Sequence, residues 1–286
     1  HDAQLQKAGK LGKLKHHFRK PAQRHPVFDN LAVVQCTDKV SKKFLKDLHK
    51  NNPDIEYAEP NYVRKAIDTN PNDPSYASQW ALAKIQASKA WDTIKGNTQV
   101  VVGVIDTGVD YNHPDLAANM WHNPAEIPGN GVDDDGNGIT DDYYGMKASN
   151  GIRTGDPNDD HYHGTHVSGT ISASTNNGVG VAGVCWNVKI LALKFLDSNG
   201  SGYDSDAILC IQYAIDHGVH VLSNSWGGGG YNQALQDVIN AASNAGILFV
   251  AAAGNSNVGT PFYPASYDNV FGVAATDSND QKASFS

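Results

Sequence analysis

The sequence has little cysteine, no long apolar run and no recognisable start signal. Its 286 residues include three cysteines, Cys36, Cys185 and Cys210, which are too few for a disulfide framework and lack the C-x-x-C spacing of metal ligands. Cys185 and Cys210 either pair or remain buried free thiols. No stretch approaches the roughly 20 apolar residues of a membrane span. Because the chain begins at His1 without an initiator methionine or a signal-peptide pattern, we expect an upstream segment to have been removed or omitted.

Positive charge is scarce over most of the chain and concentrated at its start. Residues 1–70 hold 14 of the 22 Lys and Arg but only 8 of the 30 Asp and Glu, a net charge of +6 against −14 for the remainder. This asymmetry predicts two units that attract each other. The basic run 10–20 has no aromatic platform and no recognised module around it, so we expect a solvated tail and no nucleic-acid binding.

A small αβ unit is predicted within residues 1–68. Residues 31–36 have the pattern of a strand, 41–50 that of an amphipathic helix, and 55–63 that of a second extended segment. The first 25 residues are basic, weakly patterned and expected to be mobile. Since this unit is too small for a core of its own, we expect it to dock on a larger domain over 69–286, with a linker near residues 68–74.

From residue 99 onward, apolar strands alternate with helical patterns. Strands are predicted at 100–105, 188–195, 220–223, 247–253 and 270–274, and helices near 163–174, 204–217 and 231–245. This alternation predicts an α/β fold, a parallel β-sheet with helices on both faces. Asp106 and Asn255 directly follow strands, at the edge of the sheet where such folds bind ligands.

Two short motifs carry the chemistry. Asp106-Thr107-Gly108 ends a strand, and His163-Gly164-Thr165-His166 begins a helix. A carboxylate and an imidazole so placed can meet above the sheet, where the carboxylate holds the imidazole in the tautomer that accepts a proton from a nucleophile. The amide of Asn255 can donate to a developing oxyanion. The alternative is a zinc site at His161, His163 and His166, but this cluster lacks the carboxylate of H-E-x-x-H.

Five segments in this order resemble the subtilisin-like serine proteases, the subtilase family, over residues 74–286. They are 104–110, 113–116, 163–170, 224–227 and 252–255. The resemblance implies that Asp106 orients His163, that His163 is general base and then general acid, and that Asn255 is the side-chain oxyanion donor. It also implies protein or peptide substrates. By the same resemblance, Ser201 and Gly202 pair with the substrate in extended form, and Ser225, Trp226 and Gly227 form the opposite wall. Ala252, Ala253 and Gly254 border the pocket for the residue before the cut.

The resemblance further implies a nucleophilic serine in a Gly-Thr-Ser-Met-Ala-like segment, and residues 1–286 contain no such segment. Ser225 matches a wall of the substrate cleft instead. We therefore expect the nucleophile to lie beyond Ser286 and the chain as given to be inactive. The alternatives are an inactive homologue that binds peptides or regulates a protease, and a calcium-binding structural protein.

An acidic loop predicts a calcium site. Asp133, Asp135, Asn137, Gly138 and Ile139 follow the spacing of positions 1, 3, 5, 6 and 7 of an EF-hand loop. Position 12 is Tyr144 rather than Glu, so Asp141 or Asp142 would have to complete the shell. A solvated acidic turn is the alternative.

The subtilase resemblance implies a second calcium site. Its ligands would be the side chains of Gln79, Asp115 and Asn177 and the carbonyls of Thr175, Val179 and Val181. A cation that joins distant segments binds only the native state and therefore stabilises it.

Residues 52–62 resemble the end of a subtilase propeptide. The resemblance implies a proform in which the leading unit assists folding and inhibits the cleft, with cleavage near residues 65–70. It also implies a secreted protein or one of a secretory compartment.

Overall fold

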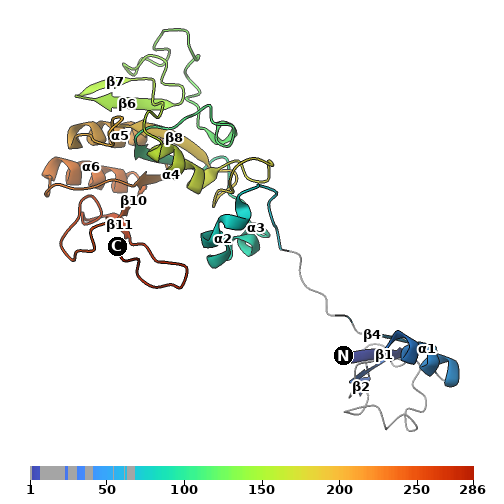
Figure 1. The fold of residues 1–286 in the computed structure, drawn as a ribbon. Coiled ribbons are helices and arrows are strands. Elements are labelled where there is room, and N and C mark those ends of the chain that lie inside the picture. The colour runs from blue at the N-terminus through green and yellow to red at the C-terminus, as the bar shows by residue number, and fades with distance from the viewer. Residues whose placement is uncertain are drawn as a thin grey trace. The chain divides into compact units, whose positions relative to one another are not determined.

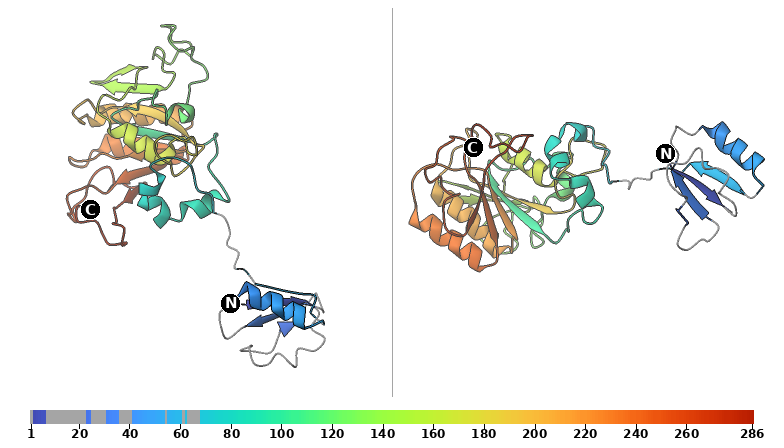
Figure 2. Two further views of the ribbon diagram at one scale, coloured as in Figure 1. Left: turned by 45° about the vertical axis from the view of Figure 1, so that its right-hand side comes forward. Right: turned by 90° about the horizontal axis from the view of Figure 1, so that it is seen from below.

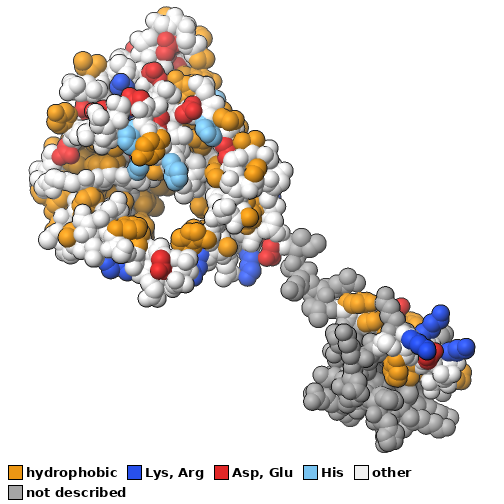
Figure 3. Space-filling model, viewed as in Figure 1, with side chains coloured by type: hydrophobic (Ala, Val, Ile, Leu, Met, Phe, Trp, Pro, Cys, Tyr) orange, Lys and Arg blue, Asp and Glu red, His pale blue; other side chains and the backbone are white. Residues whose placement is uncertain are grey.

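The structure, a computed structural model, describes residues 2–6, 23–24, 31–35, 41–53, 55–60, 62 and 68–286. The chain divides into two compact units, His1–Ile67 and Asp68–Ser286 (Figure 1). The basic side chains drawn for the first unit lie on its helix, whereas acidic side chains are spread over the viewed face of the second (Figure 3).

The described residues of the first unit form a four-stranded antiparallel sheet with one α-helix. Its elements are β1 (Asp2–Gln6), β2 (Gln23–Arg24), β3 (Leu31–Gln35), α1 (Lys42–Asn51) and β4 (Tyr57–Pro60), with strand order β2-β3-β1-β4. The amphipathic pattern of α1 buries Leu45 and Leu48, and the helix packs against β4.

The N-terminal strand corrects one expectation. The first residues were expected to be mobile, yet β1 lies inside the sheet, where it pairs with both β3 and β4. A five-residue segment with one large apolar residue carries almost no local signal, so long-range pairing decides its conformation. The remainder of the first 25 residues, apart from 23–24, lies outside the described residues.

The second unit is built on a seven-stranded sheet in the order β11-β10-β9-β5-β8-β6-β7. All neighbouring strands are parallel except the β6–β7 pair. The strands are β5 (Val101–Asp106), β6 (Gly145–Ser149), β7 (Ile152–Thr154), β8 (Lys189–Lys194), β9 (Val221–Asn224), β10 (Leu248–Ala252) and β11 (Val270–Val273). The predicted α/β class with a parallel sheet is confirmed.

Helices cover both faces of this sheet (Figure 2). They are α2 (Trp80–Lys84), α3 (Ala87–Trp91), α4 (His163–Ser172), α5 (Asp204–Asp216) and α6 (Gln233–Asn244), with 3₁₀ turns at Tyr76–Ser78 and Ala117–Asn119. On β5, Val102 and Val104 face a core shared with α4, while Ile105 faces the larger core under α5 and α6. Because β5 is buried on both faces, its sequence is continuously apolar up to Asp106. No helix in the described part of the chain is long and apolar enough to cross a membrane.

The hairpin β6–β7 and the short helices α2 and α3 were not predicted. The hairpin turns at Asn150-Gly151, both with positive φ (52° and 78°), and Asn-Gly is the strongest short-range hairpin signal. That dipeptide could have revealed it.

Cys185 and Cys210 are free thiols, so their pairing is not observed. Cys210 is fully buried in α5 and Cys185 is half-buried. Burial raises the pKa of both, which keeps them protonated and unreactive. Cys36 lies outside the described residues.

Candidate active site

The carboxyl end of β5 and the first residue of α4 meet at one point. Asp106, fully buried, accepts a hydrogen bond from the ring of His163: Nδ1 lies 2.8 Å from Oδ1 and 3.0 Å from Oδ2. The imidazole is 40% exposed, and its Nε2 has no hydrogen-bond partner among the described residues. A carboxylate on Nδ1 fixes the tautomer that leaves Nε2 free to accept a proton.

Glycine at 164 allows this approach. A Cβ at Gly164 would collide with the carbonyl oxygen of Gly108 and lie 3.1 Å from Cβ of Asp106. The helix start therefore packs directly on the turn after β5, which explains why glycine follows the histidine.

Asp159 holds the same two segments together. It accepts from the backbone N–H groups of His161 (2.9 Å), Tyr162 (3.0 Å) and Thr165 (3.0 Å), and from the hydroxyl of Thr107 (2.9 Å). Burial alone would raise the pKa of Asp159, but these donors and the Thr165 hydroxyl outweigh it and lower the pKa. Sequence reasoning missed this residue because its role depends on contacts across the turn after β5.

Low pH should weaken the hydrogen bonds that Asp159 accepts from these two segments. A carboxyl whose folded pKa is lowered stabilises the fold above its unfolded pKa of about 3.9 and loses that contribution as pH falls through the folded value. Asp159→Asn should therefore lower Tm at pH 7, and the difference from the wild type should shrink as pH falls below the unfolded pKa and through the lowered folded pKa. Calorimetry over a series of pH values measures this, and a difference that does not shrink in acid would contradict it.

A buried lysine links three segments around the site. Lys194, at the end of β8, is 2% exposed, and its ammonium donates to the carbonyls of Thr107 (2.5 Å) and Leu196 (2.9 Å) and to Oδ1 of Asp160 (2.6 Å). Thr107 follows Asp106, Asp160 precedes the α4 histidine, and Leu196 begins the loop towards Ser201. Lys194 thus holds together the turn after β5, the segment that leads into α4 and the loop after β8.

Replacing this lysine should be costly. Lys194→Met leaves the two carbonyls without their donor, at about 1–3 kcal/mol for each buried unsatisfied group. For a unit of this size each kcal/mol lowers Tm by about 2–4 °C. The matched control is Lys189→Met on the same strand, where a less buried ammonium makes one bond, to the carbonyl of Ala118. Equal losses of Tm in the two variants would refute the role of Lys194.

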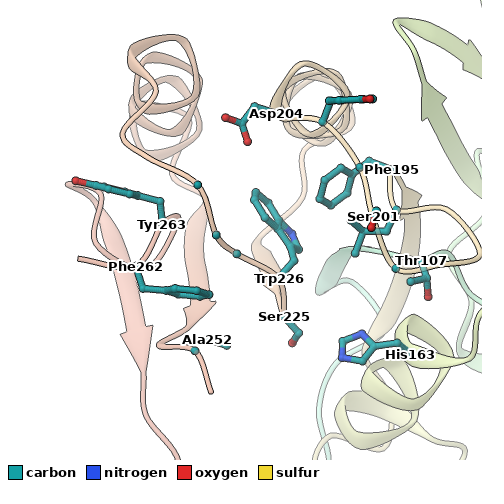
Figure 4. Close-up of a pocket in the computed structure, with 18 of the residues that line it drawn as sticks. Thr107, His163, Phe195, Ser201, Asp204, Ser225, Trp226, Ala252, Phe262 and Tyr263 are labelled. Atoms are coloured by element: carbon teal, nitrogen blue, oxygen red, sulfur yellow. The ribbon is translucent and has the colours of Figure 1, made fainter. Parts of the chain in front are cut away.

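A cleft of about 1050 Å³ opens beside His163 (Figure 4). Of the predicted substrate-binding and oxyanion residues, the cleft is lined by Ser201, Gly202, Ser225, Trp226, Gly227, Ala252, Gly254 and Asn255. Ala253 is not among the lining residues, and its N–H donates to the carbonyl of Val273. Two walls of the cleft come from the segments after β8 and β9, and a third from the end of β10.

The comparisons with known proteins agree with this geometry. The sequence profile described as the subtilase family matches residues 97–286. The chain belongs to the subtilase family. It is 43% identical over 238 residues to the thermophilic serine proteinase of Bacillus sp. (strain AK1), covering 82% of this chain and 53% of that protein. It is 40% identical over 218 residues to thermitase of Thermoactinomyces vulgaris, covering 76% and 69%.

The fold also resembles that of a solved protease structure. A protease from Pseudoalteromonas arctica PAMC 21717 aligns with a TM-score of 0.62 and 32% identity, covering 76% of this chain and 69% of that one. The prediction of a subtilisin-like serine protease is therefore confirmed at the level of family and fold. The chain spans about half the length of the Bacillus relative.

The acidic loop of this subtilase gathers several predicted ligands. Ligand oxygens of Glu126, Asp133 and Asp135 lie within 4.8 Å of one another, and Asp135 forms a second such group with Asp142 and His217. Glu126 is 5% exposed, and its Oε2 has no hydrogen-bond partner among the described residues. Burial raises the pKa of Glu126, and the charges of Asp142 and Asp135 add to the shift. An unpaired buried oxygen beside carboxylates fits a hard cation with oxygen ligands.

The other predicted residues of this loop lie beside the cluster. The amide of Asn137 donates to Asp135 (3.1 Å) and Asp142 (2.8 Å), and Asn137 Oδ1 accepts from the N–H of Ile139. Asp141 instead accepts from the N–H groups of residues 130 and 131, so the geometry favours Asp142 as the residue that closes the shell. Sequence reasoning missed Glu126, which precedes the EF-hand-like spacing.

The second predicted calcium set joins the loop after α4 to Gln79, just before α2, and to Asp115, which follows β5. Asp115 accepts from the amide of Asn177 (2.8 Å) and the N–H of Val181 (2.9 Å), and Asn177 Oδ1 accepts from Val179. Thr175 belongs to the same loop, and the Gln79 side chain bonds both backbone groups of Ala182 (2.8 Å each). The structure thus brings these segments together. It adds Asp73, 4% exposed, which accepts from the N–H of Asn176 (2.7 Å).

The zinc alternative finds no support. No metal-ligand group that includes His161, His163 or His166 occurs among the described residues. His166 is exposed, and the His161 and His163 rings are 6.4 Å apart between centroids. The histidines therefore do not converge on one point.

Proposed function

We propose that this chain belongs to a calcium-stabilised serine endopeptidase that hydrolyses peptide bonds by an Asp-His-Ser mechanism. The observation that carries the proposal is the buried Asp106 carboxylate bonded to His163 at the mouth of a long cleft. Relatives in the family are named as serine proteinases.

In the proposed mechanism Asp106 holds the Nδ1–H of His163 and stabilises the imidazolium that forms when Nε2 takes the proton of a serine hydroxyl. The same imidazolium then returns the proton to the leaving amine. Asn255, at the end of β10, donates to the oxyanion as negative charge develops on the scissile carbonyl.

We propose that the nucleophilic serine lies outside residues 1–286. Ser225 lines the cleft as part of its wall, and no serine hydroxyl among the described residues bonds His163. The wall segments at Ser201–Gly202 and Ser225–Gly227 would hold an extended substrate by its main chain, while a pocket between segments 225–227 and 252–254 takes the side chain before the scissile bond.

We propose that calcium binds at two sites. The ligands at the acidic loop would be Asp133, Asp135, Asn137, Ile139 and Asp142, together with Glu126. The ligands at the second site would be Gln79, Asp115, Thr175, Asn177, Val179 and Val181, together with Asp73. Bound there, Ca²⁺ would supply a hard cation that neutralises clustered carboxylates and joins distant segments of the native chain.

Residues 1–68 are proposed to be a propeptide that inhibits its own catalytic domain, residues 69–286, in a secreted proform. Support comes from the resemblance of residues 52–62 and from the opposite charges of the two parts. The description of a relative as an extracellular serine protease, Nep of Natrialba magadii, agrees with secretion.

The rival is an inactive subtilase homologue that binds peptides or regulates a protease. The coding sequence beyond Ser286 and a hydrolysis assay of the full-length protein separate the two. A Gly-Thr-Ser segment and cleavage of unfolded protein substrates are expected. A continuation without that serine, together with an inert full-length protein, would establish the rival.

A further inference from the structure

One aromatic ring occupies the slot between two walls of the cleft. Phe262 lies between the wall segment 225–227 and the end of β10 (Figure 4). A Cβ at Gly227 would collide with Cε1 of Phe262. A Cβ at Gly254 would lie 3.1–3.3 Å from three atoms of the same ring. The ring therefore touches both walls at the positions where neither wall has a side chain.

The backbone beside the ring is fixed to the wall. The N–H of Gly228 donates to the carbonyl of Tyr263 (2.9 Å). The N–H of Phe262 donates to Ser266 Oγ (2.9 Å), and Ser266 returns a bond from its own N–H to the carbonyl of Phe262 (2.9 Å). These bonds set where the side chain leaves the main chain, so the half-buried ring is directed into the slot.

We propose that Phe262 is a specificity-determining residue that shortens the pocket for the substrate side chain before the scissile bond. This rests on the proposed function, in which that side chain enters between segments 225–227 and 252–254. With the ring in the slot, the remaining space accepts Gly, Ala or Ser. An aromatic or long aliphatic side chain would have to displace the ring from its contacts with both glycines, which is unfavourable. The substrate class is thus peptides with a small residue before the cut.

The test compares two peptide substrates that differ only in the residue before the cut, Ala or Phe, with the full-length protease. The wild type should have the higher kcat/KM for the alanine peptide. Phe262→Ala should raise kcat/KM for the phenylalanine peptide by about 10- to 200-fold, the range for adding or removing groups in an apolar pocket. The alanine peptide should be little affected, and Phe262→Leu should fall between.

Phe271→Ala is the matched control, since Phe271 is 63% exposed on β11 and does not line the cleft; its ratio of the two kcat/KM values should equal that of the wild type. A wild type that cleaves the phenylalanine peptide as well as the alanine peptide would overturn the inference and leave the proposed function intact. A ratio of kcat/KM for the phenylalanine and alanine peptides that is the same in Phe262→Ala as in the wild type would also overturn the inference. If Phe262→Ala does not fold, a wild-type series with Ala, Leu and Phe before the cut decides by the trend with side-chain size. A full-length protein that cleaves no peptide would refute the proposed function, and this inference with it.

Discussion

Replacing His163 by alanine should reduce kcat of the full-length protein on the order of 10⁶-fold, the size of the loss known for subtilisin, a member of this family. The variant should also leave the propeptide uncleaved. Without the imidazole nothing accepts the serine proton, while Asp106 stays buried and held by the N–H of Thr107 (2.7 Å). The fold should therefore survive, as measured by circular dichroism and Tm alongside peptide hydrolysis.

His166→Ala is the control for this variant. His166 lies one turn along α4, is exposed, and does not line the cleft. Its removal should leave hydrolysis and processing near the wild-type rate. Normal propeptide processing in His163→Ala would show that another group activates the nucleophile.

Removal of calcium should lower the melting temperature by roughly 5–15 °C for each occupied site. A ligand present at about 100–1000 times its Kd stabilises the native state by about 2.7–4.1 kcal/mol, and a unit of about 200 residues loses about 2–4 °C per kcal/mol. Calorimetry in excess Ca²⁺ and in a chelator measures the difference. Glu126 and the carboxylates of its loop then repel one another without compensation.

Two isosteric variants assign the effect to its site. Glu126→Gln should remove the part that arises at the acidic loop, and Asp115→Asn the part that arises at the loop after α4. Each variant should respond less to the chelator than the wild type, and the two reductions should add because the sites are separate. A Tm insensitive to the chelator would reject calcium at both sites.

The sequence predicted those parts of the fold that local pattern controls. The strands β5, β8, β9, β10 and β11 were predicted within one or two residues, because each contains a short β-rich run of apolar residues. In β5 and β8 this run is almost fully buried. The strand β1 and the hairpin β6–β7 were not predicted, since they carry few large apolar side chains and since β1 and β6 also pair with strands far along the chain, β3 and β8. Residues 2–6 become a strand only in the presence of β3 and β4.

The residues of the candidate site also fall into those that a local motif predicted and those whose roles depend on contacts between distant segments. Asp106 and His163 were found because each sits in a motif whose position on a strand or helix is locally encoded. Asp159, Lys194 and Phe262 carry no motif. Their roles arise from contacts with Thr107, Leu196 and Gly227, most of which lie far from them along the chain. Such contacts become visible only once the topology is known.

The strand order has a consequence for the timing of folding. Asp106 ends the central strand β5, whereas Asn255 follows β10, two strands away in the sheet and roughly 150 residues later in the chain, a separation typical of slow, non-local assembly. During synthesis the emerging chain can form the Asp106–His163 pair long before β10 is available to join β9. Under the proposed function, a newly made chain would therefore be unable to stabilise an oxyanion until β10 has joined β9, even with the Asp106–His163 pair already formed.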